Sequence, residues 1–363
     1  MVFAITGGGT GGHLSIAKAL ALELKKRDIK TVFIGSTHGQ DMKWFENSDI
    51  FDKSYFLQSS GVVNKKGLKK LASMANILKL AFKCRKIFKE NSVKAVISVG
   101  GYSSAPASFA SLFFFKPLFI HEQNAILGRL NGLLEPFCKK IYSSYPRVKF
   151  ELPTGCGCVT KFTQDNTECF SKKFDYPVHE KFFKSARERE NLKTIIFLGG
   201  SQGANFINSL AKEMAPKLIE MGYNIIHQCG EKSYDEIYKF YKENALNVEL
   251  VGFCENLDML IAKADLCIGR SGASTLWELC ANNLPAIFIP FPFATGDHQY
   301  YNAKFLADLG LSQIIRQDES NSEKILNLIK NFDIKSTSKA LKNSINPNGT
   351  AMIIDDILQI LGK

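Results

Sequence analysis

The chain lacks an apolar run long enough to cross a membrane, and it lacks the features of an export signal. Its longest apolar stretch, residues 105–115, is shorter than the roughly 18 residues that a spanning helix requires and is interrupted by Pro106 and serines. Met1 leads directly into VFAITGGG, without the basic segment and apolar core of a signal peptide. We therefore expect a soluble protein that is at most peripheral to a membrane.

Patterns that hold metals or ATP are also missing. The nine cysteines are scattered, and Cys156 and Cys158 are too close together for the usual zinc site, so we interpret all nine as reduced cytosolic thiols. There is no Asp-x-Asp pair to hold a divalent cation against a diphosphate, and no Gly-Lys-Ser/Thr sequence to form a P-loop. The sequence therefore argues against ATP hydrolysis and predicts no metal site and no required cofactor.

Acidic residues are scarce in the first part of the chain. Residues 1–150 hold 23 Lys and Arg against 9 Asp and Glu, whereas the remaining residues hold 23 against 26, so the net charge of +11 comes from the first part. Such a field favours an anionic partner, which could be nucleic acid, an anionic membrane surface or a phosphorylated substrate.

Short apolar strands alternate with helical patterns throughout, which predicts an α/β protein with parallel sheets. The predicted strands are residues 2–6, 31–34, 95–99, 118–121 and 140–143 in a first series and residues 194–198, 224–228, 249–251, 266–268 and 286–290 in a second. Each series opens alike, with an apolar strand, a glycine-rich turn and a helix. The sequence therefore predicts two similarly built, Rossmann-like domains.

The domain boundary is predicted from composition. A polar stretch from about Tyr145 to Asn191 contains three prolines and is predicted to hold the connection. We place the first domain at residues 1–176 and the second at residues 177–344. The apolar-periodic tail within residues 345–363 is expected to form a helix that crosses back onto the first domain.

The sequence GGGTGGH (Gly7–His13) lies between a predicted strand and a predicted helix. This context suits the approach of backbone N–H groups to a phosphate at a helix N-terminus, with Gly8, Gly9 and Thr10 as candidate positions. Two alternatives stay open. One is a tight structural turn, and the other is an NAD site, although Asp41 lies too far beyond the second strand to be its ribose-binding acid.

His13 follows this loop in the first turn of the predicted helix. The positive end of the helix dipole favours the neutral, proton-accepting imidazole, so His13 is a candidate general base. A structural role is the alternative.

A second glycine turn, VGGYSSAP, supplies Gly100, Gly101, Tyr102 and Ser103 after another predicted strand. We expect it to lie beside the first loop and to bind an anion with it, an ordinary turn between strand and helix being the alternative. In the second domain, GGSQGA (199–204) and RSGASTLWE (270–278) resemble loops that hydrogen-bond a pyrophosphate, and Glu278 is placed to accept hydrogen bonds from a ribose.

Residues 65–89 carry nine basic residues, and no acidic residue occurs from Lys53 to Lys89. Apolar residues recur at helical spacing in this segment, which is typical of a basic amphipathic helix at an anionic membrane interface. The predicted membrane patch comprises Leu71, Leu78, Phe82 and Lys83. The alternative is a helix that packs its apolar face on the core, and residues 112–115 (LFFF) could belong to the patch or to the core.

Taken together and in this order, GGGTGGH, VGGYSSAP, HEQN (His121–Asn124), GGSQGA and RSGAST with Glu278 make the chain similar to the MurG family within glycosyltransferase family 28. The resemblance implies a GT-B fold, in which two Rossmann-like domains face a deep cleft. It also implies inverting transfer of N-acetylglucosamine from UDP-N-acetylglucosamine (UDP-GlcNAc) to lipid I, forming lipid II through a β-1,4 bond and releasing UDP.

The resemblance also implies where the partners bind. The C-terminal domain would hold the donor, and the N-terminal domain would hold lipid I. The protein would sit at the cytoplasmic face of the bacterial inner membrane, against anionic phospholipid, with no nucleic acid partner. His13 would be the general base.

Residue by residue, the resemblance implies a donor site. Asn124 would contact the sugar, and Phe253 and Cys254 would form the uracil pocket. The residues that would bind the rest of UDP-GlcNAc are Thr10, Gly11, Gly12, His179, Ser201, Gln202, Gly203, Ala273, Ser274, Thr275, Glu278, His298, Gln299 and Asn302.

Two positions depart from the family pattern. His179 stands where the family has an arginine that reaches a donor phosphate, and His298 stands where glutamine is typical. The residues alone leave other functions open: a UDP-sugar epimerase, another glycolipid glycosyltransferase, an NAD-dependent dehydrogenase or a non-catalytic nucleotide-sugar-binding protein.

Overall fold

A computed structural model describes residues 1–61, 67–146, 174–200, 204–254 and 256–363. The chain divides into two compact units. Residues 1–177 and 348–363 form unit 1, and residues 178–347 form unit 2.

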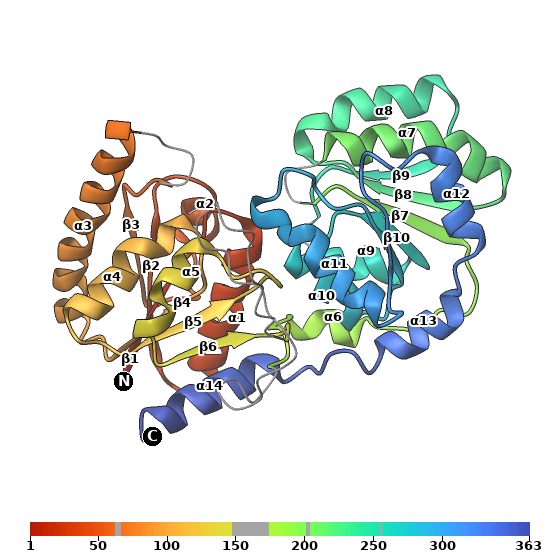
Figure 1. The fold of residues 1–363 in the computed structure, drawn as a ribbon. Helices are drawn as coiled ribbons and strands as arrows, with labels where there is room; N and C mark the ends of the chain where they lie inside the picture. Colours follow the sequence, from red (N-terminus) through yellow and green to blue (C-terminus); the bar gives the residue numbers. More distant parts are fainter. Residues whose placement is uncertain (62–66, 147–173, 201–203, 255) are drawn as a thin grey trace, which may run out of the picture. The chain divides into compact units, whose positions relative to one another are not determined.

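Unit 1 is built on a parallel six-stranded sheet in the order β3-β2-β1-β4-β5-β6 (Figure 1). Its strands are β1 (Val2–Thr6), β2 (Lys30–Ser36), β3 (Lys53–Leu57), β4 (Ala95–Ser98), β5 (Leu118–Glu122) and β6 (Lys140–Ser143). Its helices are α1 (Gly11–Lys26), α2 (Asp41–Phe45), α3 (Gly67–Glu90), α4 (Ala105–Phe113), α5 (Arg129–Leu134) and α14 (Gly349–Ile360), with 3-10 turns η1 (Tyr102–Ser104) and η2 (Glu135–Phe137). The strand order reverses between β1 and β4, where ligands of such sheets usually bind.

Unit 2 repeats this topology with a parallel sheet in the order β12-β11-β10-β7-β8-β9. Its strands are β7 (Thr194–Leu198), β8 (Asn224–Gln228), β9 (Val248–Val251), β10 (Leu266–Gly269), β11 (Ala286–Phe288) and β12 (Gln313–Ile314). Its helices are α6 (Glu180–Lys184), α7 (Asn205–Glu220), α8 (Tyr234–Glu243), α9 (Leu257–Ala262), α10 (Ala273–Ala281), α11 (His298–Asp308), α12 (Ser322–Lys330) and α13 (Ile334–Leu341), with 3-10 turns η3 (Glu231–Ser233) and η4 (Thr295–Asp297). The order reverses between β7 and β10. The α/β fold class with two parallel sheets is therefore confirmed.

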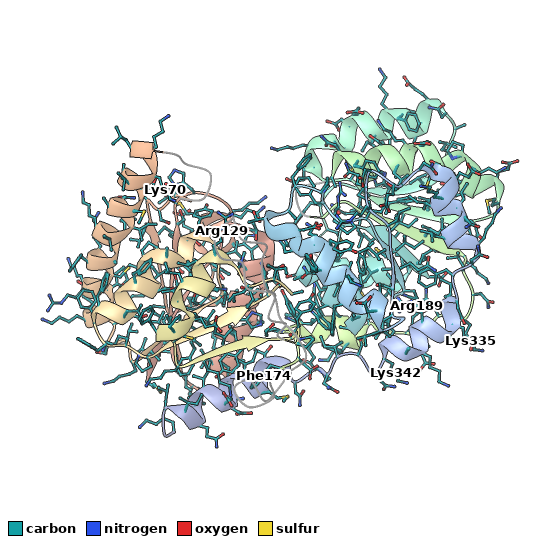
Figure 2. The ribbon with its side chains drawn as sticks, in the orientation of Figure 1. Lys70, Arg129, Phe174, Arg189, Lys335 and Lys342 are labelled. Atoms are coloured by element: carbon teal, nitrogen blue, oxygen red, sulfur yellow. The ribbon has the colours of Figure 1, made fainter. Side chains whose placement is uncertain are left out.

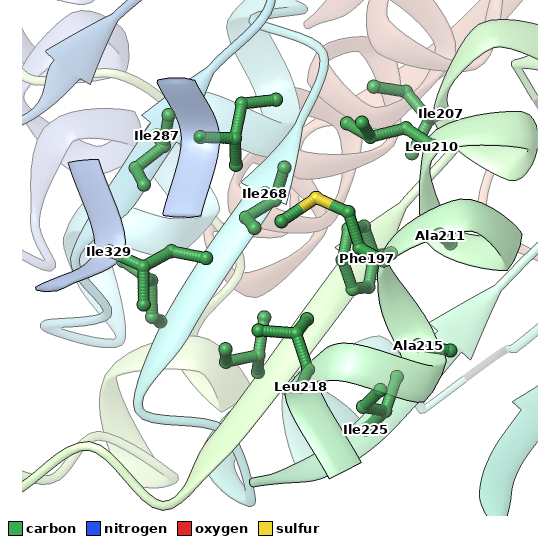
Figure 3. Packing of buried hydrophobic residues seen from close by; sticks show 14 of the residues in the cluster. Phe197, Ile207, Leu210, Ala211, Ala215, Leu218, Ile225, Ile268, Ile287 and Ile329 are labelled. Carbon is green, nitrogen blue, oxygen red and sulfur yellow. The ribbon is translucent and has the colours of Figure 1, made fainter. Parts of the chain in front are cut away.

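Each sheet buries an apolar core against its helices. In unit 2, Phe197 of β7 is fully buried and packs with Ile268 of β10 and with residues of α7 (Figure 3). In unit 1, Ala4 and Val96 lie in a cluster that also includes Ala81 of α3. Strands covered on both faces are apolar along their whole length, which explains why their runs were recognised in the sequence.

The structure contains two strands that the sequence did not predict, β3 and β12, and both lie at an edge of their sheet. Residues of β3 after Lys53 are only partly buried, and β12 has two residues. Edge position alone does not account for this, because β6 and β9 are also edge strands and the sequence predicts both. A partly buried strand and a strand of two residues give a weak apolar signal.

The C-terminal helix α14 belongs to unit 1, where it packs against α1. Arg27 at the end of α1 donates a hydrogen bond to Asp355. Asp356 accepts hydrogen bonds from Lys140 Nζ at 2.8 Å and from Tyr142 Oη at 2.7 Å. The tail is therefore attached by both charge and packing.

No helix among the described residues is both long and apolar enough to span a bilayer.

Candidate functional site

Two glycine loops of unit 1 meet at the point where the strand order reverses. They follow β1 and β4, which pair directly, with Thr6 opposite Ser98. The Gly8 N–H donates to Gly100 O at 3.2 Å, and a Cβ on Gly101 would collide with Gly8 O. Only glycine permits this backbone approach, which places the two predicted anion-binding loops side by side.

Asp41 lies beneath the first loop and is fully buried. Its carboxylate accepts from the Gly9 N–H at 2.6 Å and from the Ser36 N–H at 2.8 Å. Burial raises the pKa of Asp41, and these two hydrogen bonds oppose that rise. The Gly8 and Gly9 amides thus have partners inside the protein, so a bound diphosphate would meet loop amides from Thr10 onward.

His13 is held at the start of α1 by polar side chains on two sides. Thr10 is the N-cap residue of α1, and its Oγ1 lies 2.9 Å from His13 Nδ1. Gln123 Nε2 lies 2.9 Å from His13 Nε2 and 3.4 Å from Nδ1. His13 therefore lies in the first turn of α1, as predicted from the sequence, and its role as a general base stays a prediction.

The HEQN run ends β5 and begins a loop that Glu122 anchors. One Glu122 oxygen accepts from the Asn124 N–H at 3.0 Å, and the other accepts from the Gly128 N–H at 2.9 Å and from Asn131 Nδ2 at 2.8 Å. This carboxylate is 3% exposed, so the loop is fixed by buried hydrogen bonds. Asn124 itself is only partly buried.

His121 precedes this anchor and is 1% exposed. Neither of its ring nitrogens has a hydrogen-bond partner among the described residues. Burial and the nearby His13 charge lower the pKa of His121 to about 3, so it is neutral at physiological pH.

Tyr102 and Ser103 occupy different environments. Tyr102 is partly exposed, its ring lies against Gly9, and its Oη donates to His38 O at 2.8 Å. Ser103 is buried. Of these two predicted loop residues, Tyr102 is the one whose side chain remains accessible.

In unit 2, the loop after β10 leads into α10, whose first turn is Ala273, Ser274 and Thr275. The N-terminus of a helix favours a phosphate there through its N–H groups and dipole. Arg270, at the end of β10, donates to Ile289 O at 2.9 Å and to Gln317 Oε1 at 2.7 Å. Burial lowers the pKa of Arg270 to about 10. Through these hydrogen bonds, Arg270 connects the end of β10 to the segment after β11 and to Gln317.

Glu278 lies on α10 just over one turn beyond this N-terminus and is partly buried. Burial raises the pKa of Glu278 to about 7, Lys181 lowers it, and Asp258 raises it further. The carboxyl group therefore changes charge near neutral pH, which is unusual for a glutamate.

The predicted sugar-binding residues at the start of α11 hold the loop after β10. Gln299 O accepts from Ser271 Oγ at 2.7 Å, and Gln299 Oε1 accepts from the Phe291 N–H at 3.0 Å. Asn302 is fully buried, and its Nδ2 donates to Ser271 O at 3.2 Å. His298 Nδ1 donates to Thr295 O at 2.9 Å and leaves the ring partly exposed.

His179 caps α6, because its Nδ1 accepts from the Lys181 N–H at 3.2 Å. In the neutral ring this places the proton on Nε2. Phe253, in the turn after β9, is 47% exposed, and Cys254 beside it is partly buried. The predicted positions Ser201, Gln202 and Gly203 lie outside the described residues.

The outer face of α3 is apolar and exposed. The helix buries Ser73, Ile77, Ala81 and Cys84, whereas the predicted apolar stripe faces outward. The exposed apolar patch consists of Leu68, Leu71, Met74, Leu78 and Phe82 of α3, together with Phe113 and Phe115. The alternative in which this stripe packs on the core is therefore wrong.

Aromatic rings and basic residues complete this patch. The Phe82 ring stacks on Phe113 with centroids 6.0 Å apart, so residues 112–115 contribute to both patch and core. Lys83 is exposed beside Phe82, and Lys70 projects from the first turns of α3 (Figure 2).

Sequence reasoning missed three residues of these sites. Gln123 stands in the quoted HEQN run, but no local pattern shows that it contacts His13, 110 residues away. Asp41 and Arg270 likewise act on loops that are distant in sequence. Within the described part of the chain, no three His, Cys, Asp or Glu side chains are grouped so as to hold a metal ion.

Two family models match the chain. Residues 3–143 match the glycosyltransferase family 28 N-terminal domain, and residues 194–357 match the glycosyltransferase family 28 C-terminal domain.

Curated relatives match along almost their whole length. The UDP-N-acetylglucosamine--N-acetylmuramyl-(pentapeptide) pyrophosphoryl-undecaprenol N-acetylglucosamine transferase of Campylobacter hominis is 56% identical, over 99% of this chain and 98% of the relative. The Helicobacter pylori protein of the same name is 45% identical, over 99% of both chains.

Solved structures are similar as well. MurG of Acinetobacter baumannii is 27% identical with a TM-score of 0.74, over 99% of each chain. The calicheamicin glycosyltransferase CalG4, at 13% identity and a TM-score of 0.64 over 100% of this chain and 98% of that one, shares the fold.

Proposed function

The chain belongs to glycosyltransferase family 28, and from this premise we propose that it transfers N-acetylglucosamine from UDP-GlcNAc to lipid I in peptidoglycan synthesis. The observation that carries this function is the 56% identity, over 99% of the chain, to a transferase named for that reaction. Transfer to the acceptor hydroxyl forms the β-1,4 bond of lipid II and releases UDP.

A coupled assay tests this function. UDP should be released from UDP-GlcNAc only when a lipid I analogue is present, and labelled sugar should appear in the lipid product. An epimerase would change the sugar without an acceptor, and a binding protein would be stabilised by UDP without turnover. Either result would reject the transferase.

The proposed chemistry is a single displacement with inversion. The acceptor hydroxyl attacks the anomeric carbon, the bond from that carbon to the diphosphate oxygen breaks, and UDP carries away the electron pair. His13 takes the hydroxyl proton. Loop N–H groups and the start of α10 would stabilise the charge on the leaving diphosphate.

Each unit has its own proposed ligand. Unit 1 would hold the acceptor diphosphate near Thr10, Gly101 and Tyr102. Unit 2 would hold the donor, with the diphosphate at Ser274 and Thr275 and the ribose at Glu278. Because Asn302 and Gln299 bond to the loops around Ser271 and Phe291, we infer that they shape the sugar pocket from behind.

The raised pKa of Glu278 gives the donor site a pH dependence. As the pH rises through about 7, Glu278 loses its proton and becomes a stronger acceptor for ribose hydroxyls. UDP affinity should therefore increase about fivefold more in the wild type than in Glu278→Gln between about pH 6 and about pH 8. Calorimetric titration checks this, and Glu278→Gln controls for titration of the UDP phosphate. Equal pH slopes for the two proteins would remove Glu278 from the ribose site.

We propose that the exposed apolar patch of unit 1 binds the anionic surface of the cytoplasmic membrane face. Its apolar side chains would enter the interface, and the lysines of α3 would meet lipid phosphates. Exposure of Phe82 at 62% and Phe115 at 94% supports this proposal, because contiguous exposed apolar surface marks an interaction site.

The double variant Leu78→Ser, Phe82→Ser should bind vesicles containing phosphatidylglycerol at least about tenfold more weakly, because two exposed apolar side chains can then no longer enter the interface. Sedimentation with vesicles measures this, and added salt should weaken wild-type binding. The matched control replaces two exposed apolar residues of unit 2, Tyr238→Ser and Leu309→Ser, and should bind like wild type. Unchanged binding by the α3 variant would place the membrane contact elsewhere.

A further inference from the structure

Arg316 lies just beyond β12 and contacts the first turn of α11, which packs against that strand. Its Nη2 donates to Asp297 Oδ2 at 2.8 Å, and its Cζ lies 3.8 Å from the centroid of the Tyr300 ring. Asp297 is the N-cap residue of α11, and Tyr300 is the third residue of the helix. The guanidinium of Arg316 therefore holds the first turn of α11 through both an ion pair and a stacking contact.

The backbone at the start of α11 has an unfavourable conformation. Gly296 and Asp297 are both left-handed, with φ of 65° and 56°. A residue other than glycine adopts this conformation at a cost in free energy, although aspartate tolerates it better than most. An aspartate N-cap usually has an extended backbone and accepts from the helix N–H groups, but the Asp297 side chain makes no such bond. Its carboxylate is paired with Arg316 instead, which keeps the turn from relaxing into an ordinary cap.

We propose that Arg316 is a positioning residue for the donor sugar, an inference that rests on the proposed function. The turn that Arg316 holds carries His298, whose ring is partly exposed, and Gln299, whose side chain bonds to the segment after β11. Both residues belong to the proposed sugar pocket. Loss of the Arg316 guanidinium would free Asp297 to cap the helix, and the resulting change of backbone would displace His298 and Gln299 from the sugar.

The residue after Arg316 is anchored to the end of β10. Gln317 Oε1 accepts from Arg270 Nη2 at 2.7 Å, and Arg270 Nη1 donates to Ile289 O at 2.9 Å. Arg270 directly follows β10 and precedes the loop that leads to the proposed diphosphate position at Ser274. The backbone that carries Arg316 is therefore fixed independently of α11. Because removal of the Arg316 side chain leaves the bond from Arg270 to Gln317 in place, its effect should be confined to the sugar.

Two ligands distinguish this role from a general loss of structure, because UDP-GlcNAc carries the sugar and UDP does not. In Arg316→Met, the Kd for UDP-GlcNAc should rise about tenfold, as expected when a hydrogen bond to the sugar is lost, and the Kd for UDP should stay at its wild-type value. Calorimetric titration of the full-length protein measures both. Arg316→Lys keeps a cation for Asp297 but loses the planar stacking group, so its Kd for UDP-GlcNAc should lie between those of the wild type and Arg316→Met.

Lys304→Met is the matched control, because Lys304 pairs with Asp308 at 2.7 Å on the same helix, beyond its first turn. This variant should bind both ligands like the wild type. Equal changes of the two Kd values in Arg316→Met, or wild-type values for both, would overturn the proposal. If Arg316→Met does not fold, the two Kd values of Arg316→Lys decide in the same way. A wild type that binds both ligands but transfers no sugar to a lipid I analogue would instead reject the proposed function, and the Kd values would still decide the role of Arg316.

Discussion

Replacement of His13 by alanine is expected to lower kcat for transfer to a lipid I analogue by about 10²- to 10⁴-fold, the usual effect of removing a general base. The donor is bound by other residues, so UDP affinity should change little. Initial rates with saturating UDP-GlcNAc measure the first effect, and calorimetric titration with UDP measures the second. The rate should fall while UDP affinity stays nearly unchanged, because His13 interacts with the proton that moves in the transition state and not with the bound UDP.

The control for this prediction lies on the same helix. Lys26 is in the last turn of α1 with a side chain that is 70% exposed, so Lys26→Ala should keep the wild-type rate. Folding is compared through the thermal unfolding midpoint of each variant. A His13→Ala protein that is folded and turns over at the wild-type rate would show that another group removes the proton.

Replacement of Arg189 by methionine is expected to lower the stability of unit 2 by about 3 kcal/mol, through unsatisfied buried acceptors. Arg189 is 1% exposed, and no carboxylate pairs with it among the described residues. Its guanidinium donates instead to Ile261 O and Ala264 O near the end of α9 and to the carbonyl and side-chain oxygens of Asn282 at the end of α10. Burial lowers the pKa of Arg189 to about 9, so it keeps its charge at neutral pH.

The size of this effect follows from what the substitution leaves behind. Methionine fills much of the volume but donates nothing, and the carbonyl oxygens cannot be removed with the arginine. A loss of about 3 kcal/mol in a unit of this size should lower Tm by roughly 6–12 °C. Differential scanning calorimetry measures the change.

Lys335 provides the matched comparison. It lies in the same unit (Figure 2), its side chain is 67% exposed, and it pairs with Glu190 at 3.5 Å. Lys335→Met should change stability by less than about 1 kcal/mol, since exposed ion pairs contribute little. Equal Tm values for the two variants would show that the Arg189 hydrogen bonds do not hold the helix ends together.

Most of each sheet could be predicted because buried parallel strands are apolar runs that end in glycine-rich turns. Val2–Thr6 and Thr194–Leu198 were predicted with the bounds that the structure shows. The sequence does not predict β3, which is only partly buried, or β12, which has two residues, because neither provides a long apolar run. The apolar pattern of a strand is weaker where one of its sides is exposed to solvent.

For helix α3, the local sequence pattern predicts the helix but does not decide which of its faces is buried. Its apolar spacing predicted an amphipathic helix, yet apolar residues occur on two faces, such as Leu78 and Phe82 on one and Ile77 and Cys84 on the other. The neighbours in the fold decide which face is covered. The sequence left core and membrane as alternatives, and the structure showed which stripe is exposed.

The sequence by itself determined the strand–loop–helix repeats, the glycine positions and the family, because backbone geometry imposes short periods and fixed turn residues on nearby positions. Only the tertiary structure decided that the Gly9 N–H donates to Asp41, that Arg189 hydrogen-bonds to residues at the ends of α9 and α10, and that Gln123 contacts His13. Those contacts join residues far apart in the chain, brought together by the strand order of each sheet. A single sequence carries no local signal for which distant side chains will meet.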